Sequence, residues 1–329
     1  REATLLVESP GVAQKYQKDF KAISKFTPQI VEGAIPIPRE FMENRKLASQ
    51  MVSSSDSMIM KFYLWVQKLS YENKSLEVKI TADELNNYFY KDDPVKFGKC
   101  DVIQYFMKHH LCKYIKRYSF LKSYKRDEVN KTLNIELSAE NKPELDSLYI
   151  SPLFWQDGWD RRLSEKAVFC YFYVLDKTES GRMGRYFEEF KWDAVDEYHV
   201  GHAIFAYGTG ELQRYNLIEK DIQYRPGEEN PNAFILNEFY VYEDFQASLD
   251  KLKSETEPEL FKTVQGIADY VNESSDLEHI KELISLGKKY GLKVMQDSLA
   301  EMKKYTNSVS PYKRYAYVRA MIKNKGEGK

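Results

Sequence analysis

Pairs of histidines and cysteines are the residues of this sequence whose spacing suits metal chemistry. His199 and His202 lie three residues apart beside Glu197, and imidazole nitrogens together with a carboxylate are common ligands of zinc. The run His109–Cys112 offers two histidines and a thiol. Neither pattern is followed by a further ligand at a characteristic distance, and adjacent histidines on a helix point in different directions. We therefore expect ordinary histidines, no metal and no cofactor.

Patterns typical of nucleophilic or nucleotide-dependent enzymes are missing from the sequence. Cys170 lies in an apolar stretch, which favours a buried thiol over a reactive one. No Gly-x-Ser-x-Gly elbow and no Gly-rich phosphate-binding loop occurs. Gly208-Thr209-Gly210 lacks the lysine of such a loop, and we interpret these glycines as a helix break. The sequence thus predicts a protein without catalytic residues.

Length and composition limit the class of protein. The chain has 329 residues, of which 43% are apolar and 30% charged, so it is long enough for about two domains with sizeable cores. The longest apolar run, Ala167–Leu175, is about half as long as the roughly twenty residues of a membrane span. Three cysteines without metal-ligand spacing are typical of a reduced, intracellular chain. We expect a cytoplasmic protein with no membrane partner.

Charge is segregated along the chain although the net charge is only −1. The segment Lys99–Lys131 holds nine basic and three acidic residues, and Lys303–Lys329 holds eight basic residues and one acid. Much of the compensating charge lies in Glu238–Glu259, with seven acids against two lysines. Local patches of one sign matter more for binding than the sum does. The two basic segments are therefore candidates for contact with a polyanion.

Elements of the first half follow an order that we can predict from periodicity and caps. The expected helices and strands cover 57–71 (helix), 76–80 (strand), 81–89 (helix), 99–114 (helix), 114–121 and 132–137 (strands), with a polar tip over 122–131. Ser53–Asp56 supplies N-cap chemistry for the first helix, and Thr81 with Glu84 has the spacing of a capping box. The apolar side of the long third helix holds Val102, Ile103, Phe106 and Leu111. Helix, strand, helix, helix and β-hairpin is the order of a winged helix.

The same order is predicted a second time, without sequence identity between the copies. Its elements are expected over 163–176 (helix), 187–192 (strand), from 193 (short helix), 200–215 (helix), from 217 (strand) and 234–242 (strand). After Glu243 the periodicity becomes purely helical, with helices expected over 245–253, 259–272, 277–290, 294–305 and 312–324. The last stretch indicates a small helical domain.

These patterns predict an α+β chain with two winged-helix-like domains followed by a small all-helical C-terminal domain. The predicted parts are an extended N-terminal arm (1–45), winged-helix domain 1 (46–140), a linker (141–160), winged-helix domain 2 (161–243) and the helical domain (244–329). Ile35–Pro38 must be extended, because a residue before proline avoids the helical region.

Basic residues on the third helix and hairpin of domain 1 are the candidate contacts with double-stranded DNA. Phosphate contacts position a protein on the duplex, and side chains of the helix read base edges. The candidates are Lys99, Lys108, Lys113, Lys116 and Arg117 on or after the helix; Lys122, Lys125, Arg126 and Lys131 on the hairpin; Arg214 and Arg225 in domain 2; and Lys313, Arg314 and Arg319 near the end. Tyr105, Tyr114, Tyr118 and Tyr124 interleave with the first set, and their hydroxyl groups can bond to phosphate. The alternative is that these cations only solvate a helix face.

The less basic domain 2 has two interpretations. Arg182, Arg185, Arg214 and Arg225 are candidate contacts, but several acids surround them in the sequence. This domain either binds DNA weakly or serves as an interaction surface.

The tandem pattern resembles plasmid and phage replication initiators of the Rep_3 type, over residues 40–243. The run Tyr312–Asn324 is similar to the closing helix of DnaD-like replication proteins. The resemblance implies a protein that recognises origin repeats and recruits host replication proteins through its C-terminal helices, without catalysis of its own; a homodimer is compatible with it. Two alternatives stay open, a winged-helix transcriptional repressor and a protein-interaction adaptor that binds no DNA.

Overall fold

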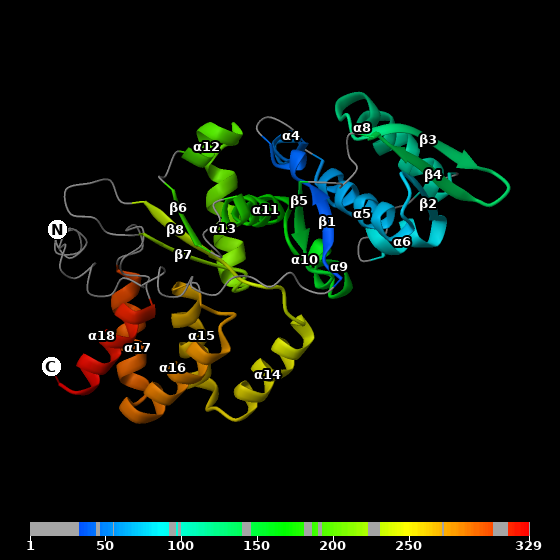
Figure 1. Cartoon of the computed structure of the whole chain (residues 1–329). Helices are drawn as coiled ribbons and strands as arrows, with labels where there is room; N and C mark the ends of the chain where they lie inside the picture. Colours follow the sequence, from blue (N-terminus) through cyan, green and yellow to red (C-terminus); the bar gives the residue numbers. More distant parts are fainter. Residues whose placement is uncertain are drawn as a thin grey trace. The chain divides into compact units, whose positions relative to one another are not determined.

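The computed structural model describes residues 33–43, 47–54, 56–91, 97, 100–139, 146–180, 186–189, 193–222, 231–271, 273–304 and 315–328. These residues form two compact units, one within Ile30–Pro152 and one within Leu153–Lys329. Both units combine helices with small antiparallel sheets (Figure 1). The chain is therefore of mixed α+β class, with a purely helical region at its C-terminal end.

The first unit contains helices around one three-stranded sheet and one two-stranded ribbon. In chain order its elements are β1 (Ile35–Pro38), η1 (Arg39–Phe41), α4 (Leu47–Val52), α5 (Met58–Asn73), β2 (Glu77–Thr81), α6 (Ala82–Phe89), α7 (Val102–Phe106), η2 (Met107–Leu111), α8 (Cys112–Arg117), β3 (Leu121–Asp127), β4 (Thr132–Leu137) and β5 (Ser147–Ile150). The order in the larger sheet is β2-β4-β3, so the last strand lies in the middle.

The ribbon joins the end of the expected arm to part of the expected linker. Strand β1 pairs antiparallel with β5, placing Ile35 opposite Ile150 and Ile37 opposite Leu148. All four of these side chains are buried. The extended conformation expected for Ile35–Pro38 is confirmed, and both segments belong to the first compact unit.

The expected capping box is confirmed, and at the start of α5 the expected side-chain acceptor lies one residue before the N-cap, Ser57. The Asp56 carboxylate accepts a hydrogen bond from the Met58 amide at 3.1 Å, where α5 begins. Thr81 and Glu84 form a reciprocal capping box at the start of α6, which satisfies two amide groups that the first turn of a helix leaves unpaired. The local sequence therefore fixes where both helices begin.

A strand expected over 114–121 is wrong for most of its length. The helix continues through α8 to Arg117, and β3 begins only at Leu121. The alternation of large and charged residues here resembles a strand, but Tyr114 and Tyr118 lie four positions apart and are both buried, as expected for one side of a helix. The tip of the hairpin is correspondingly shorter than expected, covering 128–131.

The core of the first unit is a cluster of aromatic rings around Phe62 of α5. The Phe62 ring lies 5.2 Å from Phe106, 5.8 Å from Tyr114 and 6.4 Å from Phe120, between ring centres. Phe62 and Phe106 are fully buried. Such contacts fix the third helix against α5, because each buried aromatic ring removes a large apolar area from water.

The second unit begins with helices and a sheet in the same order as in the first. Its elements are α9 (Leu153–Gln156), α10 (Trp159–Arg162), α11 (Glu165–Ser180), β6 (Tyr186–Glu189), α12 (Asp193–Tyr198), α13 (His202–Arg214), β7 (Ile218–Ile222) and β8 (Asn232–Leu236). The sheet order is β6-β8-β7, again with the last strand in the middle. From α5 and from α11 onward, both units therefore run helix, strand, helix, helix, strand, strand, with α7 to α8 counted as one helix.

The helix break expected at Gly208 and Gly210 is wrong, because both glycines lie inside α13. A Cβ atom at Gly208 would come within 2.3 Å of the Lys166 carbonyl oxygen and 2.5 Å of Cys170 Sγ. Gly208 therefore permits close packing of α13 on α11. A Cβ at Gly210 would meet nothing within 4 Å.

The C-terminal region is helical, as its periodicity predicted. Its helices are α14 (Tyr242–Ser254), α15 (Pro258–Tyr270), α16 (Leu277–Tyr290), α17 (Leu292–Lys303) and α18 (Tyr315–Gly326). One apolar cluster joins α15 to α18, with Val264, Ile267, Leu283 and Val318 fully buried. No helix among the described residues is long and apolar enough to cross a membrane.

Candidate nucleic-acid interface

The third helix of the first unit, from α7 through η2 to α8, has one buried and one exposed side. Val102, Ile103, Phe106 and Leu111 are buried as expected, and Tyr114 joins them. The helix begins at Asp101, whose Oδ1 accepts a hydrogen bond from the Gln104 amide at 2.8 Å. Gln104 and several cations lie on the opposite, exposed side.

The middle of this helix, Met107–Leu111, is a π-helical turn. A π turn closes its hydrogen bonds over five residues, so it takes more residues per turn than an α-helix and is often found at functional sites. Side chains four or five positions apart consequently stay on one side of the helix. Lys108, Lys113 and Lys116 are all exposed, while Leu111 remains in the core.

The exposed side of the helix carries four of the predicted site residues. Lys108, Lys113, Lys116 and Arg117 are all exposed. None of the four forms an ion pair with a carboxylate among the residues that the structure describes. The structure places these four exposed cations on one helix, where Lys113 and Arg117 also line a small pocket with Asp56; we call the four cations the basic helix face. Lys99 lies outside the described residues.

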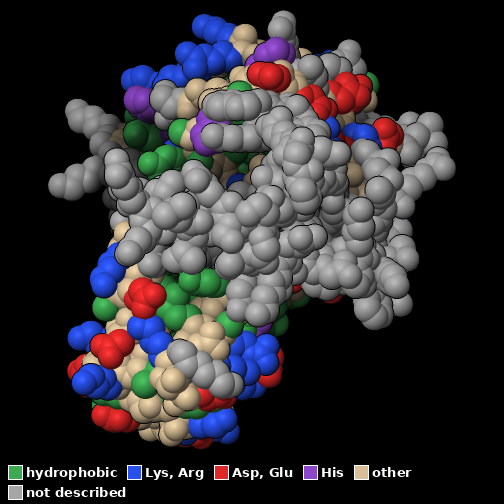
Figure 2. All heavy atoms as spheres, turned by 90° about the vertical axis from the view of Figure 1, so that its left-hand side faces the viewer, with side chains coloured by type: hydrophobic (Ala, Val, Ile, Leu, Met, Phe, Trp, Pro, Cys, Tyr) green, Lys and Arg blue, Asp and Glu red, His purple; other side chains and the backbone are tan. Residues whose placement is uncertain are grey.

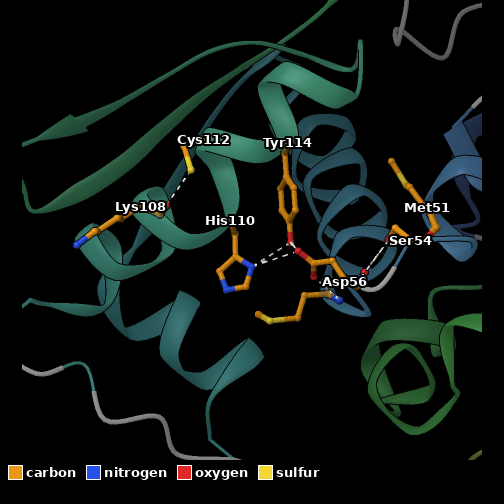
Figure 3. Close-up of polar contacts among 8 residues, drawn as sticks. Met51, Ser54, Asp56, Lys108, His110, Cys112 and Tyr114 are labelled. Carbon is orange, nitrogen blue, oxygen red and sulfur yellow. Dashed lines mark hydrogen bonds and ion pairs between the residues drawn. The ribbon is translucent and has the colours of Figure 1, made fainter.

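A half-buried carboxylate fixes the other side of the helix. Asp56 Oδ2 accepts a hydrogen bond from the Tyr114 hydroxyl at 3.0 Å and lies 3.4 Å from His110 Nδ1. Figure 3 shows His110 and Tyr114 pointing toward Asp56, whereas Lys108 points away from it. Burial by itself raises the pKa of Asp56, but hydrogen bonds from His110, Tyr114 and the Met58 amide outweigh it and hold this pKa below its ordinary value. This network ties the helix to the start of α5.

The hairpin has four cationic side chains, of which two form ion pairs with carboxylates and two do not. Lys125 is exposed opposite Asn134 of β4, and Lys131 is exposed in the turn. Neither has an acidic partner in the described part of the chain. Lys122 Nζ lies 2.5 Å from Glu136 Oε1, and this hydrogen bond raises the pKa of Lys122 above its ordinary value. Only Lys125 and Lys131 thus offer an uncompensated charge.

Arg126 lies on the other side of β3 and connects the hairpin to the third helix. Its Nη2 is 2.7 Å from Asp101 Oδ2, and its Nε is 3.0 Å from Glu128 Oε2. Asp101 is also the N-cap of α7. Because side chains alternate along a strand, Lys125 and Arg126 face opposite sides. Arg126 therefore links the hairpin to the N-cap of the helix and offers no free charge.

Two of the four tyrosines that could bond to phosphate are buried in the structure. Tyr114 and Tyr118 are only 1% and 6% exposed. The Tyr114 hydroxyl donates a hydrogen bond to Asp56, and Tyr118 is the extended residue that follows α8. Tyr105 and Tyr124 are half-buried, so for them phosphate contact stays a prediction.

Helix α13 occupies the corresponding place in the second unit. Its exposed side chains are His202, Ala203, Ala206, Tyr207 and Arg214. None of them is acidic. The nearby Glu211 points to α11, where its carboxylate accepts hydrogen bonds from the Ser164 amide at 2.9 Å and the Ser164 hydroxyl at 2.5 Å. Arg225, like the side chains of Arg182 and Arg185, lies outside the described residues.

The basic segment near the end of the chain is only partly described. Lys313 and Arg314 fall outside the described residues. Arg319 Nε lies 2.6 Å from Glu282 Oε1, so its charge is compensated. On the face shown in Figure 2, the lower part of the molecule, which holds α15 to α18, carries basic and acidic side chains interspersed. The described part of this region thus offers no block of one sign on that face.

Two groups of functional interest escaped the sequence analysis. The contact of Asp56 with His110 and Tyr114 joins residues more than fifty positions apart, which no local pattern reveals. Glu273, Asp276 and His279 are the one set of three metal-ligating side chains that converge among the described residues. The histidine pairs at 199 and 109 form no such set there.

Comparison of the chain with family models, with curated proteins and with solved structures found no match. The assignment of a function therefore depends on the geometry of the two units and on the charges that they expose.

Proposed function

We propose that this chain binds double-stranded DNA and acts as a replication initiator of a mobile element, a plasmid or a phage. The observation that carries the proposal is the basic helix face, where four exposed cations lack a described acidic partner. Lys125 and Lys131 add two such charges on the adjoining hairpin. An exposed cationic helix beside a hairpin suits a polyanionic duplex, since each neutralised phosphate releases counterions.

We infer that both units are winged-helix domains. The shared order of elements supports this, as does the position of the last strand in the middle of each sheet. In DNA-binding proteins of this general type the later helix enters the major groove, where base edges present distinct hydrogen-bonding patterns. In the first unit that helix carries the basic helix face, and in the second it is α13.

Each part of the interface has a separate task in this proposal. Lys113, Lys116 and Arg117 contact phosphates and set the register, which carries no sequence information by itself. Gln104 is exposed near the start of the same helix, and a glutamine amide can pair with the major-groove edge of adenine. Arg126 and Asp101 hold the hairpin and the helix in one fixed relation.

The second unit is proposed to make a weaker contact with the same duplex. Its helix α13 exposes small side chains, an aromatic ring at Tyr207 and one cation at Arg214, with no acid among them. Two such units in one chain fit repeated sites better than a single site. The C-terminal helices would then be left for host replication proteins.

A selection from a pool of random duplexes tests this function. The full chain is incubated with the pool at low and at moderate salt, and retained duplexes are sequenced. We expect enrichment of one sequence at moderate salt, followed by a footprint that covers tandem repeats. The matched control is a chain in which Lys108, Lys113, Lys116 and Arg117 are all changed to alanine, for which enrichment should be lost.

Other outcomes of this selection identify the alternatives. A footprint on a single palindrome would indicate a repressor and would overturn the initiator role. Failure to retain any duplex at low salt would overturn DNA binding altogether and would indicate an adaptor for other proteins.

A further inference from the structure

The strongest unassigned cluster of side chains in the described residues lies in the helical region. Glu273, Asp276 and His279 each offer one donor atom, and these three atoms all lie within 4.8 Å of one another. His279 Nδ1 is 3.0 Å from Glu273 Oε2 and 3.2 Å from Asp276 Oδ2. All three side chains are half-buried, between 15% and 26% exposed. We propose that these residues form a binding site for a divalent transition-metal cation of the Zn²⁺ type.

Two carboxylate oxygens lie close to the same imidazole nitrogen, and one proton on that nitrogen cannot make a good hydrogen bond to both of them. A single N–H can make one well-directed hydrogen bond, so the second oxygen is left with only a strained share of it. A divalent cation at the same point accepts a lone pair from all three donors. Metal–donor distances of about 2.0 to 2.2 Å put neighbouring donors roughly 3 to 3.5 Å apart. The separations of His279 Nδ1 from Glu273 Oε2 and from Asp276 Oδ2, 3.0 and 3.2 Å, match that spacing.

The positions of the donors follow from the local sequence. Asp276 is the N-cap of α16, and its Oδ1 accepts a hydrogen bond from the His279 amide at 3.0 Å, which leaves Oδ2 for the site. Glu273 comes from the preceding turn, and its amide donates to the Ala268 carbonyl at 2.8 Å. The positive end of the helix dipole, about half a charge, disfavours a cation here. Two carboxylates outweigh that effect.

The imidazole ring is held in place by its neighbours on two helices. The Tyr315 ring of α18 stacks on His279 with ring centres 3.7 Å apart and an angle of 16°. The Tyr315 hydroxyl in turn donates to Glu282 Oε2 at 2.7 Å, and Arg319 pairs with the other oxygen of Glu282. Outer partners that orient a ligating histidine are typical of metal sites and raise affinity. The ring therefore needs no large rearrangement before it binds a metal.

The set of donors narrows the kind of metal. Imidazole nitrogen suits Zn²⁺ and its transition-metal neighbours, whereas Mg²⁺ and Ca²⁺ prefer oxygen donors alone. Three protein donors leave at least one coordination position for water. A metal here would join the turn before α16 to the helix itself, independently of whether the chain binds DNA.

Titration of the full chain with Zn²⁺ by calorimetry, after dialysis against a chelator, tests the site. We expect one equivalent per chain, lost in His279→Gln and weakened at least tenfold in Glu273→Gln. The matched control is Glu278→Gln in the first turn of α16, whose carboxylate is exposed and pairs with Lys281; it should bind as the unchanged chain does. Circular dichroism of each variant verifies that it is folded. If His279→Gln is unfolded, Glu273→Gln alone is used as the test variant.

Two further measurements separate a built site from a simple ion-pair network. Co²⁺ bound to the full chain should give a visible absorption band that Glu278→Gln retains and His279→Gln loses. Amide hydrogen exchange over 273–279 should slow when Zn²⁺ is added. Equal Zn²⁺ binding by the unchanged chain and by both site variants, or no binding by any of them, would overturn the proposal and leave an ion-pair network only.

Discussion

Removal of the basic helix face should flatten the salt dependence of DNA binding. The change is the quadruple substitution of Lys108, Lys113, Lys116 and Arg117 by alanine in the full chain. All four side chains are exposed and lack described acidic partners, so the aromatic core under the helix stays intact. The variant should therefore fold as the unchanged chain does.

The magnitude follows from the number of uncompensated cations. With Lys125 and Lys131 of the hairpin, the proposed contact surface has six such cations, and each phosphate contact adds about −0.9 to the slope of log K against log salt. The ceiling for these six cations is a slope of about −5, and the four substitutions should remove up to about 3.6 of it. Raising salt fourfold then weakens binding through this surface by roughly a thousandfold before the change and roughly tenfold after it.

Fluorescence anisotropy with a labelled duplex at several salt concentrations measures both slopes. The control is Lys122→Ala, because Lys122 is paired with Glu136 and its loss should alter the slope by less than about one. A quadruple variant whose slope equals that of the unchanged chain would refute the placement of the duplex on this helix.

Three further results are expected. Gly208→Ala should destabilise the second unit by about 1–3 kcal/mol through overpacking against α11, whereas Gly210→Ala should stabilise it by about 0.5–1 kcal/mol. Urea unfolding measures the free energy of unfolding of both variants. Equal effects of the two substitutions would contradict the close packing of Gly208 on α11. Asp56 has a lowered pKa when folded, so its stabilising effect is present above the ordinary pKa near 4 and is lost as pH falls through the lower folded value. Asp56→Asn should accordingly lose less stability than the unchanged chain between pH 6 and pH 2 in urea titrations; identical losses would contradict this. Asp101→Asn keeps a cap for α7 but weakens the pairing with Arg126, so anisotropy should show reduced affinity with an unchanged salt slope. Higher affinity with a steeper slope would indicate that Asp101 acts through its charge alone.

Local signals in the sequence predicted much of the fold. The capping box of Thr81 and Glu84 is found as expected, and Asp56 accepts a hydrogen bond from the first amide of α5 although Ser57 is the N-cap. Both are short-range features. The helical periodicity after Glu243 likewise predicted the C-terminal region. Such features depend on neighbours within a few residues, which is why a single sequence reveals them.

The errors arise where distant contacts decide the structure. The alternation of large and charged residues after Tyr114 indicated a strand, but the helix continues through α8 to Arg117 because Tyr114 packs into the aromatic core against Phe62 of α5. The backbone freedom of glycine suggests a helix break at Gly208. Its actual role is to allow close packing against Lys166 and Cys170 of α11, which local sequence does not show.

Charge counting predicted the basic helix face but not which cations are free. Lys122 and Arg126 carry the same charge as Lys125 in sequence, yet acids on β4, the turn and α7 compensate them. The site at Glu273, Asp276 and His279 was missed for a similar reason, because only the fold shows two carboxylates meeting one nitrogen.

Lysine footprinting of the full chain tests the central claim most directly. The chain is acetylated with and without a duplex at low salt, and the modified lysines are read by mass spectrometry. We predict that Lys108, Lys113, Lys116 and Lys125 become protected by the duplex, whereas Lys262 and Lys293 on the C-terminal helices react equally in both samples. Binding of the duplex without protection of the basic helix face, or no binding at all, would contradict the account.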